Sequence, residues 1–65
     1  MYISENSIKK ILKEAGATRI SADASSELHK YINRLAFKTA SRAVKLSRHA
    51  KRKTIEISDI KLACE

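Results

Sequence analysis

The sequence has 65 residues, enough for one small domain, and a domain of this size buries only about 60% of its unfolded surface when it folds alone. Two usual remedies are excluded, because the single cysteine, Cys64, cannot build a disulfide framework and neither it nor the two histidines have metal-ligand spacing. Association with another chain remains as the leading way to complete the core. The 14 Lys and Arg residues outnumber the 7 Asp and Glu residues, and the net charge of +7 favours a polyanionic partner, with nucleic acid the first candidate.

The composition also argues against several other classes of protein. With no proline, no tryptophan and one glycine, the chain is a poor match to a many-turned β sandwich or barrel. The longest strongly apolar run is three residues, so we expect no membrane span or secretory signal and a cytoplasmic protein. The sequence has no glycine-rich phosphate loop and no nucleophile–base set, so we expect no enzymatic activity, no cofactor and no small-molecule substrate.

The first predicted helix covers about residues 5 to 15, where apolar residues recur at spacings of three, four and seven. Ser4 precedes this helix as its predicted N-cap. Gly16 follows it, at the position where a left-handed residue ends many helices. Residues 17–20 are too few for a helix and are predicted to form a loop with a brief extended stretch.

A second, long helix is predicted from Ala22 to about Arg48, because no glycine or proline interrupts these 27 residues. Ser21 is its predicted N-cap, and Asp23 suits the positive end of the helix dipole. At about 100° per residue, apolar and basic side chains separate into two sectors on roughly opposite sides. The basic sector contains Lys30, Arg34, Lys38, Arg42, Lys45 and Arg48.

Residues 51–57 are predicted to form a second connection, in which residues 54–57 alternate in the manner of a short strand. Ser58 is the predicted N-cap of a final short helix. The predicted fold class is therefore all-α. Residues 1–65 should form a single domain in the order short helix, loop, long central helix, loop, short helix.

The long helix implies a partner chain. A helix of 27 residues is about 40 Å long, whereas a 65-residue globule is roughly 28 Å across. The two short helices cannot cover the whole apolar sector, and large exposed apolar patches usually mark interfaces. We therefore expect two copies of the chain to cross near the middles of their long helices. The predicted dimer core includes Leu28, Ile32, Leu35 and Thr39.

Six short motifs also match a known family: Ile8-x-x-Ile11, Ala15-Gly16-Ala17, Arg19-Ile20-Ser21-x-Asp23-Ala24, Ala43-x-Lys45-Leu46-x-Arg48-His49-Ala50, Arg52-Lys53-Thr54-Ile55 and Asp59-Ile60-x-Leu62-Ala63. On these motifs the chain resembles the archaeal histones, without gaps from the first helix to the last. The resemblance implies the histone fold as an intertwined homodimer. It also implies a protein that binds, bends and wraps double-stranded DNA on the chromosome without strong sequence specificity, and dimers that join into tetramers or higher forms.

The resemblance further implies roles for particular residues. The expected DNA contacts are Arg19 in the minor groove, Lys53 and Thr54 at phosphates, and Lys10 and Lys13 as further basic contacts. The expected loop-orienting ion pair joins Arg52 and Asp59. The expected dimer–dimer surface consists of Leu46, His49, Asp59 and Leu62. Outside these sets, His29 is predicted to be merely exposed.

The chain departs from the family's pattern on the outer side of its long helix. Arg34, Lys38 and Arg42 occupy positions where acidic residues are usual in the family. Between Glu27 and Glu56 there are nine Lys or Arg residues and no acid. Like charges four residues apart on a helix repel one another. We hypothesise that this face contacts a second duplex or an adjacent DNA turn, so that the protein bridges DNA as well as bending it.

Three alternatives remain open. The chain could be a histone-fold interaction subunit that pairs with a different histone-fold chain within a transcription-regulatory complex. It could be a cationic amphipathic helix on anionic membranes, although an apolar sector rich in alanine and without tryptophan weakens insertion, and we expect no membrane partner. A helix-turn-helix repressor fits poorly, because its recognition helix is short and follows a tight turn.

Overall fold

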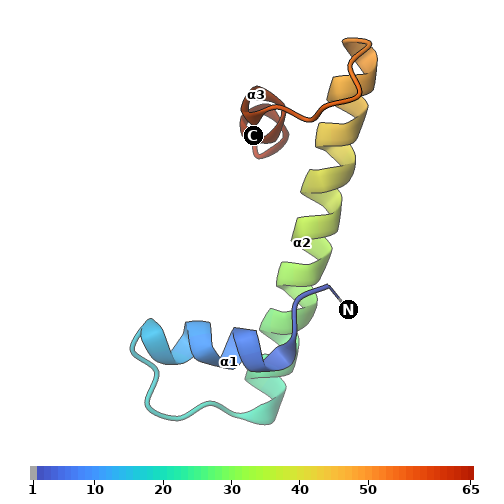
Figure 1. The fold of residues 1–65 in the computed structure, drawn as a ribbon. Helices are drawn as coiled ribbons and strands as arrows, with labels where there is room; N and C mark the ends of the chain where they lie inside the picture. The colour runs from blue at the N-terminus through green and yellow to red at the C-terminus, as the bar shows by residue number, and fades with distance from the viewer. Residues whose placement is uncertain (1) are drawn as a thin grey trace. The chain divides into compact units, whose positions relative to one another are not determined.

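The computed structural model describes residues 2–65, and within that range it contains three helices and no strand (Figure 1). The helices are α1 (Glu5–Glu14), α2 (Ala22–His49) and α3 (Ile57–Ala63). The predicted all-α class and the predicted order of helices are confirmed, and α1 and α2 end within one residue of the expected positions. The packing divides into two compact units, the first ending at Arg34 and the second beginning at Leu35.

Local capping sets both ends of α1 as predicted. The Ser4 side chain accepts a hydrogen bond from the Ser7 backbone N–H at 3.2 Å. After the helix, Gly16 has φ +113°, and its N–H donates to the Lys13 carbonyl at 3.0 Å. A second bond, from the Ala17 N–H to the carbonyl of Leu12 at 3.0 Å, completes a Schellman motif that ends the helix.

The first unit packs α1 against the beginning of α2 (Figure 1). Ile8 of α1 is fully buried and Ser25 of α2 is 1% exposed. The Ser25 hydroxyl donates to the Ala22 carbonyl at 3.1 Å, so this buried polar group is satisfied within its own helix. Ser21 caps α2 as predicted, since its hydroxyl accepts the Ala24 N–H at 3.1 Å.

A hydrogen-bonded clamp holds the segment before α1 against α2 in the same unit. The Ile3 N–H donates to the Asn33 side-chain oxygen at 2.7 Å, and the Asn33 amide donates to the carbonyls of Ile3 at 3.3 Å and of His29 at 2.7 Å. His29 Nε2 lies 2.6 Å from the Ile3 carbonyl oxygen, which makes this nitrogen a donor. The prediction that His29 is merely exposed is therefore wrong, because its ring is half-buried and engaged by main chain 26 residues away.

In the second unit, α3 lies beside the C-terminal part of α2 (Figure 1). The buried positions carry small or polar side chains, with Ala43 at 0% exposure, Ala63 at 2% and Ser47 at 3%. Small side chains let two helices approach closely, and the Ser47 hydroxyl is satisfied by the Val44 carbonyl at 2.9 Å. The contact between α2 and α3 therefore involves small side chains, and among the described residues this unit buries no large apolar side chain.

Two predictions about the second connection are wrong. Residues 54–57 form no strand, and α3 begins at Ile57 with Glu56, rather than Ser58, as its N-cap. The reason is that the Asp59 carboxylate accepts the Glu56 backbone N–H at 2.8 Å, which starts the helix two residues earlier than a Ser58 cap would. The expected extended stretch in residues 17–20 forms no strand either.

The end of α2 repeats the Schellman motif without a glycine. Lys51 has φ +59°, its N–H donates to the Arg48 carbonyl at 2.9 Å, and the Arg52 N–H donates to the Ser47 carbonyl at 2.9 Å. The left-handed region is unfavourable for a residue with a Cβ. Lys51 is therefore a locally strained position that the turn imposes.

Replacing Lys51 with glycine is expected to raise the free energy of unfolding by about 1 kcal/mol, because glycine enters the left-handed region without that penalty. The reciprocal change, Gly16→Ala, is expected to lower it by about 1 kcal/mol. An added Cβ at Gly16 meets no atom within 4 Å, so this loss isolates backbone strain from steric clash. Urea unfolding of the two variants checks both signs, and a Lys51→Gly variant of lower stability would contradict the assignment of strain.

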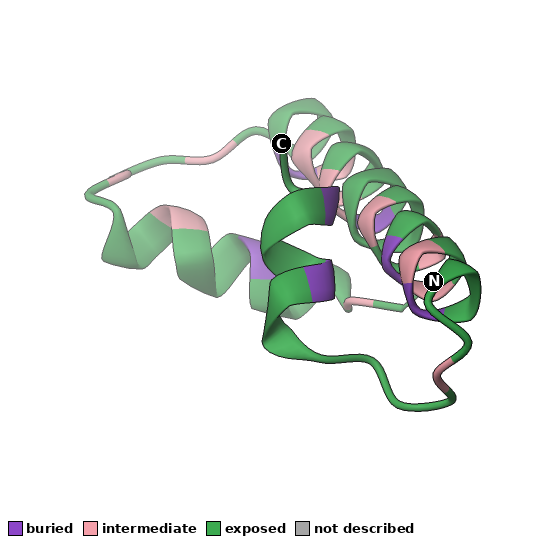
Figure 2. Ribbon diagram, turned by 90° about the horizontal axis from the view of Figure 1, so that it is seen from above, coloured by how far each residue is buried: buried purple, intermediate pink, exposed green. Residues whose placement is uncertain are grey.

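Few residues are buried in the isolated chain, as the sparse purple positions in Figure 2 show. Among residues 2–65 the buried apolar side chains are Ile8, Ala43 and Ala63 alone, whereas Leu35 is 44% exposed and Leu62 is 52% exposed. The apolar positions of all three helices thus face solvent to a large extent. Within the same range, no helix is long and apolar enough to cross a membrane.

Candidate nucleic-acid interface

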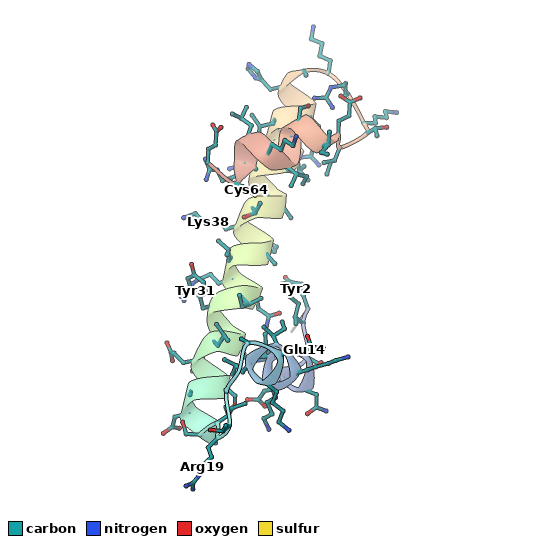
Figure 3. All side chains as sticks on the ribbon, turned by 90° about the vertical axis from the view of Figure 1, so that its left-hand side faces the viewer. Tyr2, Glu14, Arg19, Tyr31, Lys38 and Cys64 are labelled. Carbon is teal, nitrogen blue, oxygen red and sulfur yellow. The ribbon has the colours of Figure 1, made fainter. Side chains whose placement is uncertain are left out.

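The first unit presents three of the predicted DNA-contacting residues. Lys10 and Lys13 lie on α1 and Arg19 lies in the connection to α2, and all three are exposed. The Arg19 side chain extends away from the ribbon into solvent (Figure 3). No carboxylate pairs with any of the three in the described part of the chain. These cations are therefore available to an external anion.

The second unit presents Lys53 and Thr54 on the connection between α2 and α3, and both are exposed. Arg52 determines the shape of this connection. Its Nη1 donates to the Thr54 carbonyl at 2.9 Å and to Asp59 Oδ2 at 2.9 Å, while its Nη2 donates to Asp59 Oδ1 at 2.8 Å. The two parallel bonds to one carboxylate hold the guanidinium in a fixed plane. The loop that carries Lys53 is thus tied at Thr54 and anchored on α3.

The electrostatics of this ion pair favour its charged form. Hydrogen bonding from Arg52 and from the Glu56 backbone N–H lowers the pKa of Asp59 to about 2, against an opposing desolvation effect in a residue that is 5% exposed. The same hydrogen bond to Asp59 raises the pKa of Arg52. Glu56 adds a weaker, more exposed contact to Arg52 at 3.3 Å. The second loop is therefore held by a pair that stays ionised at neutral pH.

Acidification is expected to remove this contribution to stability. The pKa of Asp59 is lower in the folded protein, at about 2, than its ordinary value of 3.8, so the folded state favours the carboxylate. The stabilisation is fully present above pH 3.8 and is lost as the pH falls through about 2. Melting temperatures measured between about pH 5 and pH 2 should fall more steeply in the wild type than in an Asp59→Asn variant. Parallel pH profiles would contradict this role for Asp59.

The structure brings some predicted site residues together and leaves others in separate units. Arg52, Thr54 and Asp59 meet through hydrogen bonds in the second unit, with Lys53 between the first two. Lys10, Lys13 and Arg19 belong to the first unit. The DNA-contacting set is therefore divided between two units, each with its own basic loop.

Apart from Asp59, the remaining predicted residues lie at surfaces that the chain leaves wholly or partly open. Leu28, Ile32 and Thr39 of the predicted dimer core are half-buried, and Leu35 is exposed. In the predicted dimer–dimer set, His49 and Leu62 are exposed, Leu46 is half-buried and Asp59 is buried. Arg34, Lys38 and Arg42 are exposed and have no ion-pair partner within residues 2–65. The assignments of these residues to interfaces stay predictions.

Sequence reasoning missed a hollow of about 260 Å³ beside the second loop. Three of its lining residues are cationic and two are aliphatic: Val44, Ser47, Arg48, Arg52, Lys53 and Ile55. A signal was present in the sequence, since Arg48 and Arg52 stand four residues apart across the end of α2. Recognising it requires the left-handed turn at Lys51, which returns the chain toward the helix.

Comparison with known proteins identifies the family. The model of the family described as histone-like transcription factor (CBF/NF-Y) and archaeal histone matches residues 1–64. One of the subunits of the archaeal histone HAN1 from Thermococcus zilligii is 38% identical over 56 residues, which cover 86% of this chain and 84% of that protein. Probable archaeal histone 3 from Methanocaldococcus jannaschii is 41% identical over 54 residues, which cover 83% of this chain and 81% of that protein. With its short, long and short helices, the chain therefore belongs to this family of DNA-binding histone-fold proteins.

Proposed function

We propose that the chain acts as a homodimer that binds duplex DNA with little sequence preference, bends and wraps it, and so compacts the chromosome. The observation that carries the proposal is the pair of exposed basic loops, one in each unit, in a chain of the histone family. Arg19 of the first loop and Lys53 of the second have no carboxylate partner in the described chain. Unpaired cations on exposed loops suit phosphate binding.

The apolar side chains that the single chain leaves partly exposed support the proposed dimer. Leu28, Ile32, Leu35 and Thr39 recur on one side of α2, and the chain itself leaves all four at least partly open. Exposed apolar surface of this kind usually marks an interface, and a symmetric pairing buries the same side chains from both copies. A second copy laid across α2 would supply the apolar contacts that Ile8, Ala43 and Ala63 alone do not provide.

The proposed contacts with DNA follow from side-chain chemistry. An arginine such as Arg19 suits a narrow minor groove, where it reads groove width rather than base identity. Lys10, Lys13 and Lys53, together with the Thr54 hydroxyl, suit phosphates, which carry no sequence information. The Arg52–Asp59 pair positions the second loop through its internal bonds. The loops would thus fix the DNA on the surface while deformability sets a modest sequence preference.

We further propose that dimers join through Leu46, His49, Asp59 and Leu62. Asp59 Oδ2 accepts two hydrogen bonds within the chain, whereas Oδ1 accepts one and retains a lone pair for an imidazole from another dimer. Such joining would let one duplex run along a row of successive dimers. Bridging of two separate duplexes would need a different basic surface, outside the two loops.

A second candidate function is that of an interaction subunit which heterodimerises within a transcription-regulatory complex. The matching family description favours keeping it, because it includes the histone-like transcription factors CBF/NF-Y. Both basic loops would be retained in that role. The two candidates differ in whether the chain pairs with itself.

Native mass measurement of the protein, alone and with duplexes of increasing length, tests the proposed function. A homodimer in solution and added dimers on longer duplexes are expected. A chain that stays monomeric until a different histone-fold chain is supplied would favour the second candidate. A homodimer that gains no mass on any duplex would contradict the proposed DNA-binding role.

A further inference from the structure

The C-terminal part of α2 has three distinct sides. At about 100° per residue, the buried residues Ala43 and Ser47 lie on one side of the helix. Leu35 and Thr39, from the proposed dimer core, lie roughly a quarter-turn away from them on a second side. The remaining arc is exposed or half-buried. These three sides correspond to contact with α3, contact with a second copy, and solvent.

One edge of this remaining arc is cationic, while Phe37 and Ala40 are exposed farther round it. Lys38, Arg42 and Lys45 fall within about 60° of one another, and we call these three residues the outer stripe. The stripe lies nearly opposite the side that contains Ala43 and Ser47. The Lys38 side chain extends away from α2 (Figure 3). The stripe is open in the folded chain; Lys38 and Lys45 lie at least about 60° from Leu35 of the proposed dimer core, whereas Arg42 lies about 20° from it and borders that contact.

No acid compensates the outer stripe. Its three residues have no ion-pair partner in the described chain, and the two ion pairs found within residues 2–65 both belong to Arg52. The nearest acids along the sequence are Glu27 and Glu56, more than ten residues from the stripe on either side. The three cations stand four and three residues apart, and like charges at these helical spacings destabilise a helix. An anionic partner would convert this repulsion into attraction.

The chemistry of the stripe selects the class of partner. Protein–protein interfaces are usually centred on apolar or aromatic side chains with charges at the rim. Lys38, Arg42 and Lys45 present ammonium and guanidinium groups, and the apolar hollow lined by Phe37, Ala40 and Val44 lies on the neighbouring side of α2, reaching the stripe at Lys45. Groups of this kind bind a phosphate backbone without reading its sequence. The stripe itself therefore fits a polyanion of regular charge.

We propose that the outer stripe is a second duplex-binding surface, through which one dimer joins two separate DNA molecules. The inference rests on the proposed function, because the first duplex is held by the basic loops. The stripe is exposed in the chain, and of its three residues only Arg42 borders the proposed dimer contact. Arg34, one helical turn before Lys38, lengthens the same row of cations along α2. Compaction would then combine bending of one duplex with attachment to another.

A matched pair of variants tests the stripe. Lys38→Glu/Arg42→Glu removes its centre, and Lys30→Glu/Lys61→Glu changes two exposed lysines outside it. Each variant replaces two positive charges by two negative ones, so both lower the net charge from +7 by the same amount. A duplex fixed to beads is incubated with protein and a second, fluorescent duplex. The protein and the fluorescent DNA retained on the beads are measured separately, and far-UV circular dichroism checks that both variants fold.

We expect the wild type and the Lys30→Glu/Lys61→Glu control to retain both protein and fluorescent duplex. The stripe variant should retain protein on the fixed duplex but lose capture of the second one by about tenfold or more, because its cationic phosphate contacts are gone. Two outcomes would contradict the role of the outer stripe in binding a second duplex: equal capture by the two variants, or retention of wild-type protein without any second duplex. Either outcome would leave the proposed function intact. Failure of the wild type to bind even the fixed duplex would overturn both.

Discussion

Raising the salt concentration from about 50 to 200 mM is expected to weaken duplex binding by roughly 10³- to 10⁵-fold, if the dimer neutralises about six to ten phosphates. Each chain offers Lys10, Lys13, Arg19 and Lys53 without carboxylate partners, and a dimer doubles that set. Each cation that neutralises a phosphate releases a condensed counterion. The log–log plot of affinity against salt should therefore have a slope near −5 to −9 for roughly six to ten contacts.

Fluorescence anisotropy with a short duplex, repeated across a salt series, measures this slope. A Lys53→Ala variant should make it shallower by about 2, one contact for each chain of the dimer. Its affinity should fall by a similar factor on duplexes of unrelated sequence, because phosphate contacts carry no sequence information. A wild-type slope near −1 or −2 would be incompatible with binding through both loops and with wrapping.

Replacing Leu35 with lysine is expected to dissociate the dimer and to remove most of the helix content. Leu35 is 44% exposed in the single chain but lies in the proposed dimer core, where a second copy would bury it. Burying an unpaired ammonium costs several kcal/mol. A core of this size rarely supplies more than about 3–5 kcal/mol, so the isolated chain has little stability left to lose.

Far-UV circular dichroism and native mass measurement at the same protein concentration report both effects. Leu62→Lys is the matched control, because Leu62 is 52% exposed and lies on α3, outside the proposed dimer core. This control should stay dimeric and helical while losing only the joining of dimers. A Leu35→Lys protein that keeps its helix content and melting temperature would show that the chain folds without the proposed interface.

The helix boundaries that were predicted correctly depend on nearby residues. Ser4 and Ser21 cap helices through bonds that span three residues, and Gly16 supplies a left-handed turn directly after α1. Such signals are visible in the sequence because the partner groups are close along the chain. The basic sector of α2 was likewise visible, since helical periodicity alone separates it from the apolar residues.

The boundary that failed depends on a contact across a turn. Alternation in residues 54–57 indicated a strand, but Arg52 ties the Thr54 carbonyl and the Asp59 carboxylate together, and Asp59 also caps α3. Periodicity does not register a side chain that bonds seven residues ahead. The pairing of Arg52 with Asp59 came from the family resemblance instead, which carries information about contacts that local patterns lack.

The clamp on the segment before α1 escaped prediction for a similar reason. Asn33 and His29 engage Ile3 across 30 and 26 residues, and no local pattern singles out this pair. A buried asparagine on a helix would normally suggest a partner within the same turn. Asn33 has such a partner in the His29 carbonyl, but its side chain also completes the hydrogen bonds of a distant backbone, which only the folded chain reveals.

That clamp has a consequence for which sequence changes the chain tolerates. Asn33 and His29 bond to the N–H and the carbonyl of Ile3, never to its side chain, so they recognise a place in the chain and not a residue type. Any residue except proline can offer the same two groups at position 3. An inserted or deleted residue between positions 3 and 5, however, would move a different peptide unit into the clamp. The distance from the clamp to the start of α1 therefore works as a fixed spacer, constrained in its length and free in its sequence.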